Sequence, residues 1–308
     1  MSLNKTEAIS ILSLALIEGK LSIFVGSGIS NDPPSSLPMW DGFVDKYIEI
    51  CEELNSRIKQ EWRFDSLITD AKTRKEGDPI RTISVLKAKV DSCHTKGNID
   101  ITVCSDKIKE MFYGAKPNKK HEAIVGTAYN YILTTNYDNL LEKAAETLSY
   151  KDLLNRSFSY TRVEQMSACV YSDISAIFHA HGRISELDFG QYVLTSNDYF
   201  DIMKRNPGLR YVLNTVFMSN SILFVGYGGS DPHFEDIITD VSRTLGWTTD
   251  NGELPHYYIV LKKDKVTTIL TEHKKPVRTE IVEVDNYDEV LDILDALQKA
   301  KPRIKEHI

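Results

Sequence analysis

Two glycine-rich segments of this sequence, each placed directly after an apolar run, could hold phosphate groups. The first follows residues 21–25 and consists of Gly26, Ser27, Gly28, Ile29 and Ser30. The second follows residues 221–225 and includes Gly226, Ser230 and Asp231. Glycine lacks a side chain, so backbone N–H groups beside it can approach a phosphate closely. One such segment is equally well a structural turn, and Asp231 before Pro232 is equally well a helix cap. Two segments at strand ends together indicate a dinucleotide site.

Two further apolar runs end in side chains that could take part in catalysis. Asn136 and Asp138 follow residues 131–134, and His179 and His181 stand at the end of another run. The amide of Asn136 can hydrogen-bond a sugar hydroxyl or orient a water molecule, and a histidine with a pKa near ~6.5 can accept a proton. Asp138 is equally well the cap of the next helix, and a strand-end histidine is equally well a core residue. We expect Asn136 and His181 to matter most, and His179 less.

These segments must be held by strands that bring their ends together. Six runs are β-branched or aromatic and largely apolar on both faces, which is typical of a parallel sheet covered by helices. They span residues 21–25, 131–134, 174–179, 221–225, 256–261 and 280–284. Helical periodicity lies between them, in residues 140–148, 209–217 and 234–245. The sequence therefore predicts an α/β fold with a doubly wound, mainly parallel, Rossmann-like sheet.

After the first glycine-rich segment, the strand pattern gives way to charged amphipathic helices. They are expected at residues 43–54, 58–72, 80–90 and 103–112. We therefore predict a Rossmann-like core made of residues 1–39 and 119–308, with a helical insert of residues 40–118 that serves as a lid or an interface. Residues 116–121 are expected to form a hinge-like, solvated loop that returns to the core.

Composition argues against several classes of protein. The net charge of −7 gives no overall attraction to nucleic acid, and no apolar run approaches the roughly 20 residues that a membrane span needs. No secretory signal stands at the N-terminus, so we expect a cytoplasmic protein. The four cysteines, Cys51, Cys93, Cys104 and Cys169, form no Cys-x-x-Cys pair, so we expect buried thiols rather than a metal site.

The order of the polar segments resembles that of a known family. GSGIS after the first strand, TTNYD before a helix, His181-Gly182 at a strand end and FVGYGGSD further on are similar to the sirtuin-like, or silent-information-regulator-like, NAD-binding proteins. The resemblance covers residues 21–40 and 119–240 and is closest to the bacterial sirtuin-like NAD hydrolases of antiphage defence. Deacetylases of the family carry two zinc-holding Cys-x-x-Cys pairs and a Pro-Asp-Phe-Arg element. This chain has no such pair, and residues 37–40 read Leu-Pro-Met-Trp instead.

This resemblance implies an NAD glycohydrolase that cleaves the nicotinamide–ribose bond, releases nicotinamide and ADP-ribose, and depletes NAD during phage infection. NAD is then the substrate, and no zinc is expected. The resemblance makes Asn136 and His181 the catalytic residues, and Asp138 a residue that fixes the loop or contacts the ribose. It assigns the pyrophosphate to Gly26, Ser27, Gly28 and Ser30, and the adenosine half of NAD to Gly226, Ser230 and Asp231.

Two other functions stay open: a non-catalytic module that senses NAD or ADP-ribose, and a zinc-free protein deacylase or ADP-ribosyltransferase. The presence of both Asn136 and His181 favours an enzyme. Because an unregulated NAD hydrolase would poison its cell, we expect a homo-oligomer, or a separate sensor or ATPase partner, that gates activity. The charged helices of residues 40–118 are the expected contact surface. Thr195 and Asp198 match a Thr-x-x-Asp-Tyr stretch of the relatives, although a helix cap explains them too.

Overall fold

The fold is built on one parallel sheet. The computed structural model describes residues 2–74, 78–185, 191–202, 207–228, 236–237, 241, 256–261 and 279–305. Its strands are β1 (Ser2–Leu3), β2 (Leu21–Val25), β3 (Tyr131–Thr134), β4 (Ser157–Ser159), β5 (Ala176–His179), β6 (Ser221–Val225), β7 (His256–Leu261) and β8 (Thr279–Val284). Among the described residues they form one eight-stranded sheet in the order β1-β8-β7-β6-β2-β3-β5-β4, and every neighbouring pair is parallel. The predicted parallel α/β sheet is confirmed.

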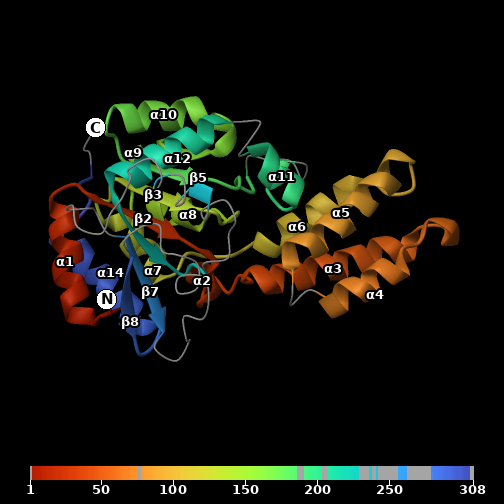
Figure 1. The fold of residues 1–308 in the computed structure, drawn as a ribbon, viewed down its shortest axis with the longest axis horizontal. Coiled ribbons are helices and arrows are strands. Elements are labelled where there is room, and N and C mark those ends of the chain that lie inside the picture. The colour runs from red at the N-terminus through yellow and green to blue at the C-terminus, as the bar shows by residue number, and fades with distance from the viewer. Residues whose placement is uncertain are drawn as a thin grey trace.

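Helices cover both faces of the sheet (Figure 1). One layer consists of α1 (Lys5–Ile17), α14 (Asp288–Ala300), α7 (Lys119–Gly126), α8 (Leu140–Thr147) and α9 (Lys151–Asn155), which contact one another in that order. The other face carries α10 (Val163–Tyr171) and α12 (Pro207–Ser219). Side chains of β2 alternate between the layers, since Ile23 and Val25 pack with the first and Phe24 with the second. This double cover explains why the strands read as continuous apolar runs.

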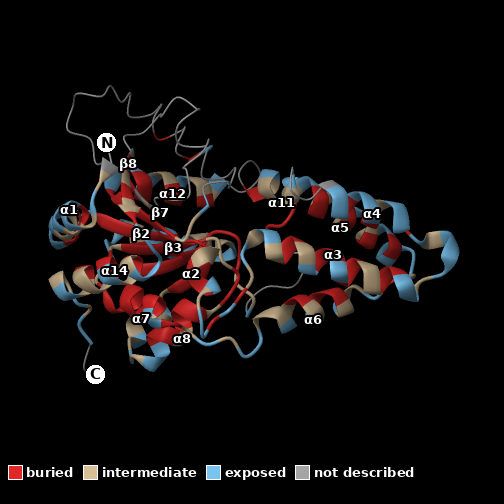
Figure 2. Ribbon diagram, turned by 90° about the horizontal axis from the view of Figure 1, so that it is seen from below, coloured by how far each residue is buried: buried red, intermediate tan, exposed pale blue. Residues whose placement is uncertain are grey.

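A group of helices between β2 and α7 extends away from the sheet, and we call it the arm. The arm consists of α3 (Trp40–Arg57), the 3₁₀ turn η1 (Gln60–Trp62), α4 (Asp65–Arg74), α5 (Pro79–Thr95) and α6 (Ile101–Phe112). Its buried faces turn toward one another and its exposed faces outward, as Figure 2 shows. They form most of a third hydrophobic cluster, which also includes Tyr137, Tyr192 and Leu194 from outside the arm. The described structure thus has an apolar core on each face of the sheet and a third in the arm.

One helix of the arm differs from its prediction. Residues 58–72 were expected to form a single helix, but η1 is followed by extended backbone at Arg63 before α4 begins. The side chain of Asn55 accepts a hydrogen bond from the Phe64 N–H at 2.7 Å and donates one to the Asp65 carboxylate at 2.8 Å. Because Asn55 supplies these bonds from α3, the break is a tertiary feature that helical periodicity does not reveal.

The remaining expectations concern cysteines and membrane spans. All four cysteines are buried and unbonded, as predicted, and burial raises the pKa of the Cys104 thiol to about 12. Over the described ranges, no helix combines the length and the apolar character that crossing a bilayer requires. Within the same ranges, no three His, Cys, Asp or Glu side chains are arranged to hold a metal ion.

The stability of the fold is expected to fall as the pH drops below about 6.5, in part because of His256. This side chain is 1% exposed, and its Nδ1 accepts a hydrogen bond from the Ile222 N–H at 3.1 Å. Burial lowers the pKa of His256 to about 3. The unfolded chain takes up a proton below about 6.5 and the folded chain does not, so the free energy of unfolding loses about 1.4 kcal/mol per pH unit in this window.

Urea unfolding of His256→Gln should therefore show a weaker pH dependence than the natural chain between about pH 7 and about pH 5. His94→Gln serves as the control, because His94 is exposed on α5. An equally steep dependence in His256→Gln would contradict the prediction.

Candidate active site

Four adjacent strands bring the predicted site residues to one edge of the sheet. β6, β2, β3 and β5 are neighbours in that order and run parallel, so their carboxyl ends meet at the same edge. In an open parallel sheet, this is the edge at which ligands bind. Each predicted polar segment begins where one of these strands ends. Of the predicted site residues, Ser230 and Asp231 lie outside the described residues.

The two glycine-rich segments touch each other through their backbones. The Gly26 N–H donates to the Val225 carbonyl and the Gly28 N–H to the Gly226 carbonyl, both at 2.9 Å. A Cβ on Gly26 would lie 2.4 Å from the Gly226 oxygen, and one on Gly226 would lie 2.6 Å from the Ile29 nitrogen. Gly226 also has a φ of +61°, which side chains disfavour. These glycines are therefore required for the close approach of the β2 and β6 loops.

Ser30 connects three separate segments of the chain. It lies on α2 (Ser27–Asn31) and is buried. Its hydroxyl donates to Asp138 Oδ2 at 2.8 Å, which leaves the oxygen to accept from Asn136 Nδ2 at 3.3 Å and to contact His121 Nε2 at 3.2 Å. Asp138 also accepts from the Leu140 N–H at 3.0 Å, although the N-cap residue of α8 is Asn139 and not Asp138. The structure thus brings Ser30, Asn136 and Asp138 together as one hydrogen-bonded group.

His121 is a member of this group that the sequence analysis missed. The prediction of a solvated loop for residues 116–121 is wrong at its end, because α7 begins at Lys119. In addition, Asn118, Lys120 and His121 are buried. The Asn118 side chain accepts from the backbone N–H groups of Lys120 and His121 at 3.0 and 3.2 Å, and donates to the Ile29 carbonyl at 2.8 Å. Burial lowers the pKa of His121. An Asn followed three residues later by a polar side chain was the available signal, because that spacing fits a capping box.

Asn136 is held by its backbone and by one end of its amide. Its N–H donates to Thr134 Oγ1 at 3.0 Å, and Nδ2 donates to the Gly26 carbonyl and to Ser30 Oγ, both at 3.3 Å. The side chain is half-buried. Its Oδ1 accepts no hydrogen bond from any residue in the described ranges. The amide is therefore oriented, with its acceptor atom left for another molecule.

A buried ionic cluster lies behind Asn136 and was also missed. His179 Nδ1 contacts the Asn136 carbonyl at 3.2 Å, and its Nε2 lies 2.8 Å from Glu142 Oε1. The same carboxylate oxygen lies 3.3 Å from Arg183 Nη1 and accepts from the Ser157 hydroxyl. Burial works to raise the pKa of Glu142, but His179, Arg183 and Ser157 together hold it at about 2. Both ring nitrogens of His179 lie within hydrogen-bond distance of acceptors, so the ring is held between Asn136 and Glu142.

His181 lies two residues beyond His179, just past the end of β5, which pairs with the strand that leads to Asn136. It is 3% exposed, and its ring packs edge-on against Tyr199 with 5.2 Å between the ring centroids. Gly182 follows with a φ of +94°, so the chain turns sharply after His181. Tyr199 belongs to α11 (Ser196–Phe200), which Thr195 caps by accepting from the Asp198 N–H at 3.2 Å. The capping explanation for Thr195 and Asp198 is therefore confirmed.

Comparison with known proteins connects this site to a family. A family model described as SIR2-like domain matches residues 130–284, about half of the chain. The chain is 23% identical to the NAD(+) hydrolase ThsA of Enterococcus faecium, covering 96% of this chain and 59% of that protein. It is 24% identical to defense-associated sirtuin 2 of Bacillus subtilis, covering 97% of this chain and 28% of that protein. The chain thus spans less than two thirds of the length of both relatives.

A solved structure from work on the mechanism and regulation of Sir2 enzymes is also similar. It aligns with 96% of this chain and 96% of its own, at a TM-score of 0.45 and 13% identity.

The contact between the two glycine loops predicts that Gly26→Ala destabilises the fold. The added methyl group would meet backbone atoms of Gly226 and Tyr227, the nearest at 2.4 Å, and backbone cannot move aside as a flexible side chain can. Overpacking of this kind costs about 1–3 kcal/mol, which urea unfolding would measure. Gly228→Ala is the control, because no described atom lies within 4 Å of its Cβ position. If the two variants were equally stable, the close approach of the loops would not require glycine at position 26.

Proposed function

Because this chain belongs to the SIR2-like domain family, we propose that it is an NAD glycohydrolase. In this reaction the bond between the nicotinamide nitrogen and ribose C1′ breaks, and water adds to C1′. The products are nicotinamide, ADP-ribose and a proton. Nicotinamide leaves as a neutral molecule, so the enzyme has little need to protonate it. Its main tasks are to position the ribose, to stabilise the positive charge that develops there, and to admit water.

The observation that carries the proposal is the state of Asn136. Its Nδ2 is fixed by Gly26 and Ser30, while its Oδ1 accepts no hydrogen bond from a described residue. An amide oxygen held in this way can accept from a ribose hydroxyl or from the attacking water. Since the amide is already oriented, little ordering remains for the moment of reaction. We assign Asn136 this positioning contact with the substrate.

We assign His181 the role of accepting the proton that the reaction releases. It follows the carboxyl end of β5, which is the neighbour of β3, and the carboxyl end of β3 leads to Asn136. A histidine at this edge can accept the proton of the attacking water, or of the ribose hydroxyl as charge redistributes. Tyr199 packs against the ring and restricts its orientation.

Several groups that were predicted to contact NAD are already hydrogen-bonded within the protein, so fewer of them remain for NAD. The N–H groups of Gly26 and Gly28 are used in joining the two loops, and the Ser30 hydroxyl is used by Asp138. Ser27 is half-buried between the glycines, and its hydroxyl bonds to no residue that the structure describes. We therefore assign the pyrophosphate contact chiefly to Ser27. The adenosine half is assigned to the loop that begins at Gly226 and continues through Ser230 and Asp231.

The biological role proposed is NAD depletion in antiphage defence. Support comes from the relatives, one named an NAD(+) hydrolase and the other a defense-associated sirtuin. Both extend well beyond the aligned region. For this chain we propose gating by self-association or by a separate sensor or ATPase partner. The arm is the proposed contact surface or lid, since its outward helix faces are charged and exposed.

Replacement of either proposed catalytic residue should abolish turnover. Asn136→Ala removes the oriented amide and His181→Ala removes the proton acceptor, and each is expected to slow NAD cleavage by at least about 100-fold. Chromatography of nicotinamide and ADP-ribose measures this. Asn139→Ala is the matched control, because Asn139 lies in the same loop and, among the described residues, its side chain hydrogen-bonds only with Ser185.

Circular dichroism and thermal unfolding establish that the variants are folded. A folded Asn136→Ala protein with full turnover would disprove the assignment of Asn136. A natural chain that binds NAD but releases no nicotinamide, in every oligomeric state tested, would favour the sensing module instead.

The ionic cluster predicts a second, smaller effect. Glu142→Gln keeps the shape of the side chain but removes the charge that holds His179, which in turn supports the Asn136 carbonyl. We expect kcat to fall about tenfold with KM little changed, because one charged hydrogen bond is weakened at a distance from the substrate.

Glu146→Gln, at an exposed position on the same helix, should keep full turnover. A role in stability alone would lower the unfolding temperature of Glu142→Gln while leaving kcat per folded molecule unchanged. That result would remove the link between the cluster and Asn136.

A further inference from the structure

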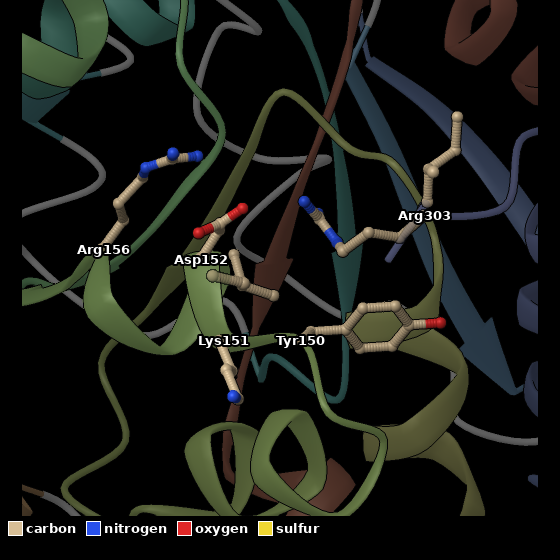
Figure 3. A pocket seen from close by; sticks show the side chains of 7 residues that line it. Tyr150, Lys151, Asp152, Arg156 and Arg303 are labelled. Carbon is tan, nitrogen blue, oxygen red and sulfur yellow. The ribbon is translucent and has the colours of Figure 1, made fainter. Parts of the chain in front are cut away.

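A small hollow lies where the end of the described chain meets α9. Its volume is about 60 Å³, and it is lined by Tyr150, Lys151, Asp152, Leu153, Arg156, Arg303 and Ile304. Figure 3 shows Arg156 and Arg303 coming from opposite sides, with the Asp152 carboxylate between them in this view. The lining residues therefore come from two segments about 150 residues apart in the sequence.

The hollow lies at the opposite edge of the sheet from the candidate active site. α9 leads into the amino end of β4, and α7 ends shortly before the amino end of β3. Figure 1 accordingly places α9 away from α2, which follows the carboxyl end of β2. None of the residues assigned to NAD lines this hollow. It is a separate feature that the proposed reaction does not use.

Positive charge predominates in the hollow. Three lining residues are cationic and one is acidic, and Lys305 adds a further cation 5.9 Å from the Tyr150 ring centroid. The side chains of Lys151, Asp152 and Arg156 form no ion pair and no hydrogen bond with the part of the chain that the structure describes. The guanidinium of the half-buried Arg156 therefore has N–H donors available to an acceptor from outside the described chain.

Arg303 is fixed in position by the end of α7. Its Nε donates to the Val125 carbonyl at 2.9 Å and its Nη2 to the Thr127 carbonyl at 3.0 Å. These bonds hold the guanidinium beside the hollow while leaving Nη1 for another acceptor. Burial is the main cause that lowers the pKa of Arg303 to about 10. Tyr150 opposes this shift, and the charge of Arg156 adds to it. Two guanidinium groups thus repel each other across a small space.

We propose that this hollow binds a phosphate group, as inorganic phosphate or as the phosphate of a small phosphomonoester. A tetrahedral anion between Arg156 and Arg303 would accept from both guanidinium groups and remove their repulsion. Lys151, at the exposed rim, would add a third positive charge. Arginine suits this role because its planar fork of donors matches phosphate oxygens.

Thermal unfolding in inorganic phosphate tests the proposal. At about 20 mM phosphate we expect the midpoint to rise by at least about 2 °C over sodium chloride of equal ionic strength. The shift should disappear in Arg156→Gln and fall by at least half in Lys151→Gln. Arg81→Gln is the matched control and should keep the full shift, because Arg81 is exposed on α5 in the arm. A parallel series with glycerol phosphate separates the two sources, since an equal or larger shift identifies a phosphomonoester as the ligand class.

The outcomes are distinct from those of the NAD assay. A shift that persists unchanged in both Arg156→Gln and Lys151→Gln would mean that phosphate binds elsewhere, such as the NAD site, and would overturn the proposal. So would the absence of any shift beyond that of chloride. If Arg156→Gln does not fold, Lys151→Gln against Arg81→Gln decides the question. Asn136→Ala should keep the full shift, so loss of NAD cleavage and loss of phosphate binding are separable.

Discussion

The hydroxyl of Ser30 is the contact on which the geometry of the site depends. It joins α2, the start of α7 and the loop after β3 through Asp138, His121 and Asn136. A buried hydroxyl that loses a partner costs about 1–3 kcal/mol, so each of these segments stabilises the position of the others. The amide of Asn136 takes its orientation from this group and from the Gly26 carbonyl. The site is therefore formed only when strands distant in sequence have paired in the correct order.

The sheet could be predicted from the sequence wherever a strand is buried on both faces. β2, β3, β6 and β7 begin and end where their apolar runs do. In β2, β3 and β6, apolar side chains pack alternately against one helix layer and the other. β1 and β4 have two and three residues, and neither shows a pattern of its own. They are strands because β8 and β5 offer edges to pair with. Local composition contains no sign of that pairing.

Site residues, too, could be predicted where their sequence neighbours reveal them, but not where distant contacts define them. Glycine, asparagine and histidine at strand ends were visible because their neighbours in sequence are apolar runs. Glu142 was not, since a glutamate near the start of a helix usually faces water, and here it is buried by His179, Arg183 and Ser157. These partners lie between 15 and 41 residues away along the chain. Only the fold shows that a charge in α8 supports the backbone of Asn136.

Charged side chains are paired at one edge of the sheet and unbalanced at the other, and β4 connects the two edges. At the carboxyl edge, the buried Glu142 carboxylate lies against His179 and is paired with Arg183. At the amino edge, cations outnumber carboxylates around the hollow, although the chain as a whole carries a net charge of −7. Arg156 is followed directly by Ser157, whose hydroxyl bonds Glu142 and accepts from Arg183 at 2.9 Å.

The contacts therefore continue from the hollow through β4 to Glu142, His179 and Asn136. The Arg156 carbonyl accepts from the Ile177 N–H at 2.9 Å, so Arg156 is also tied to β5 two residues before His179. Packed parallel strands resist small displacements, because each is fixed by hydrogen bonds on its paired edges. An anion that orders Arg156 would thus act on the same strand pair that positions Asn136. The shared strand gives the amino edge of the sheet a direct structural connection to the candidate active site at its carboxyl edge.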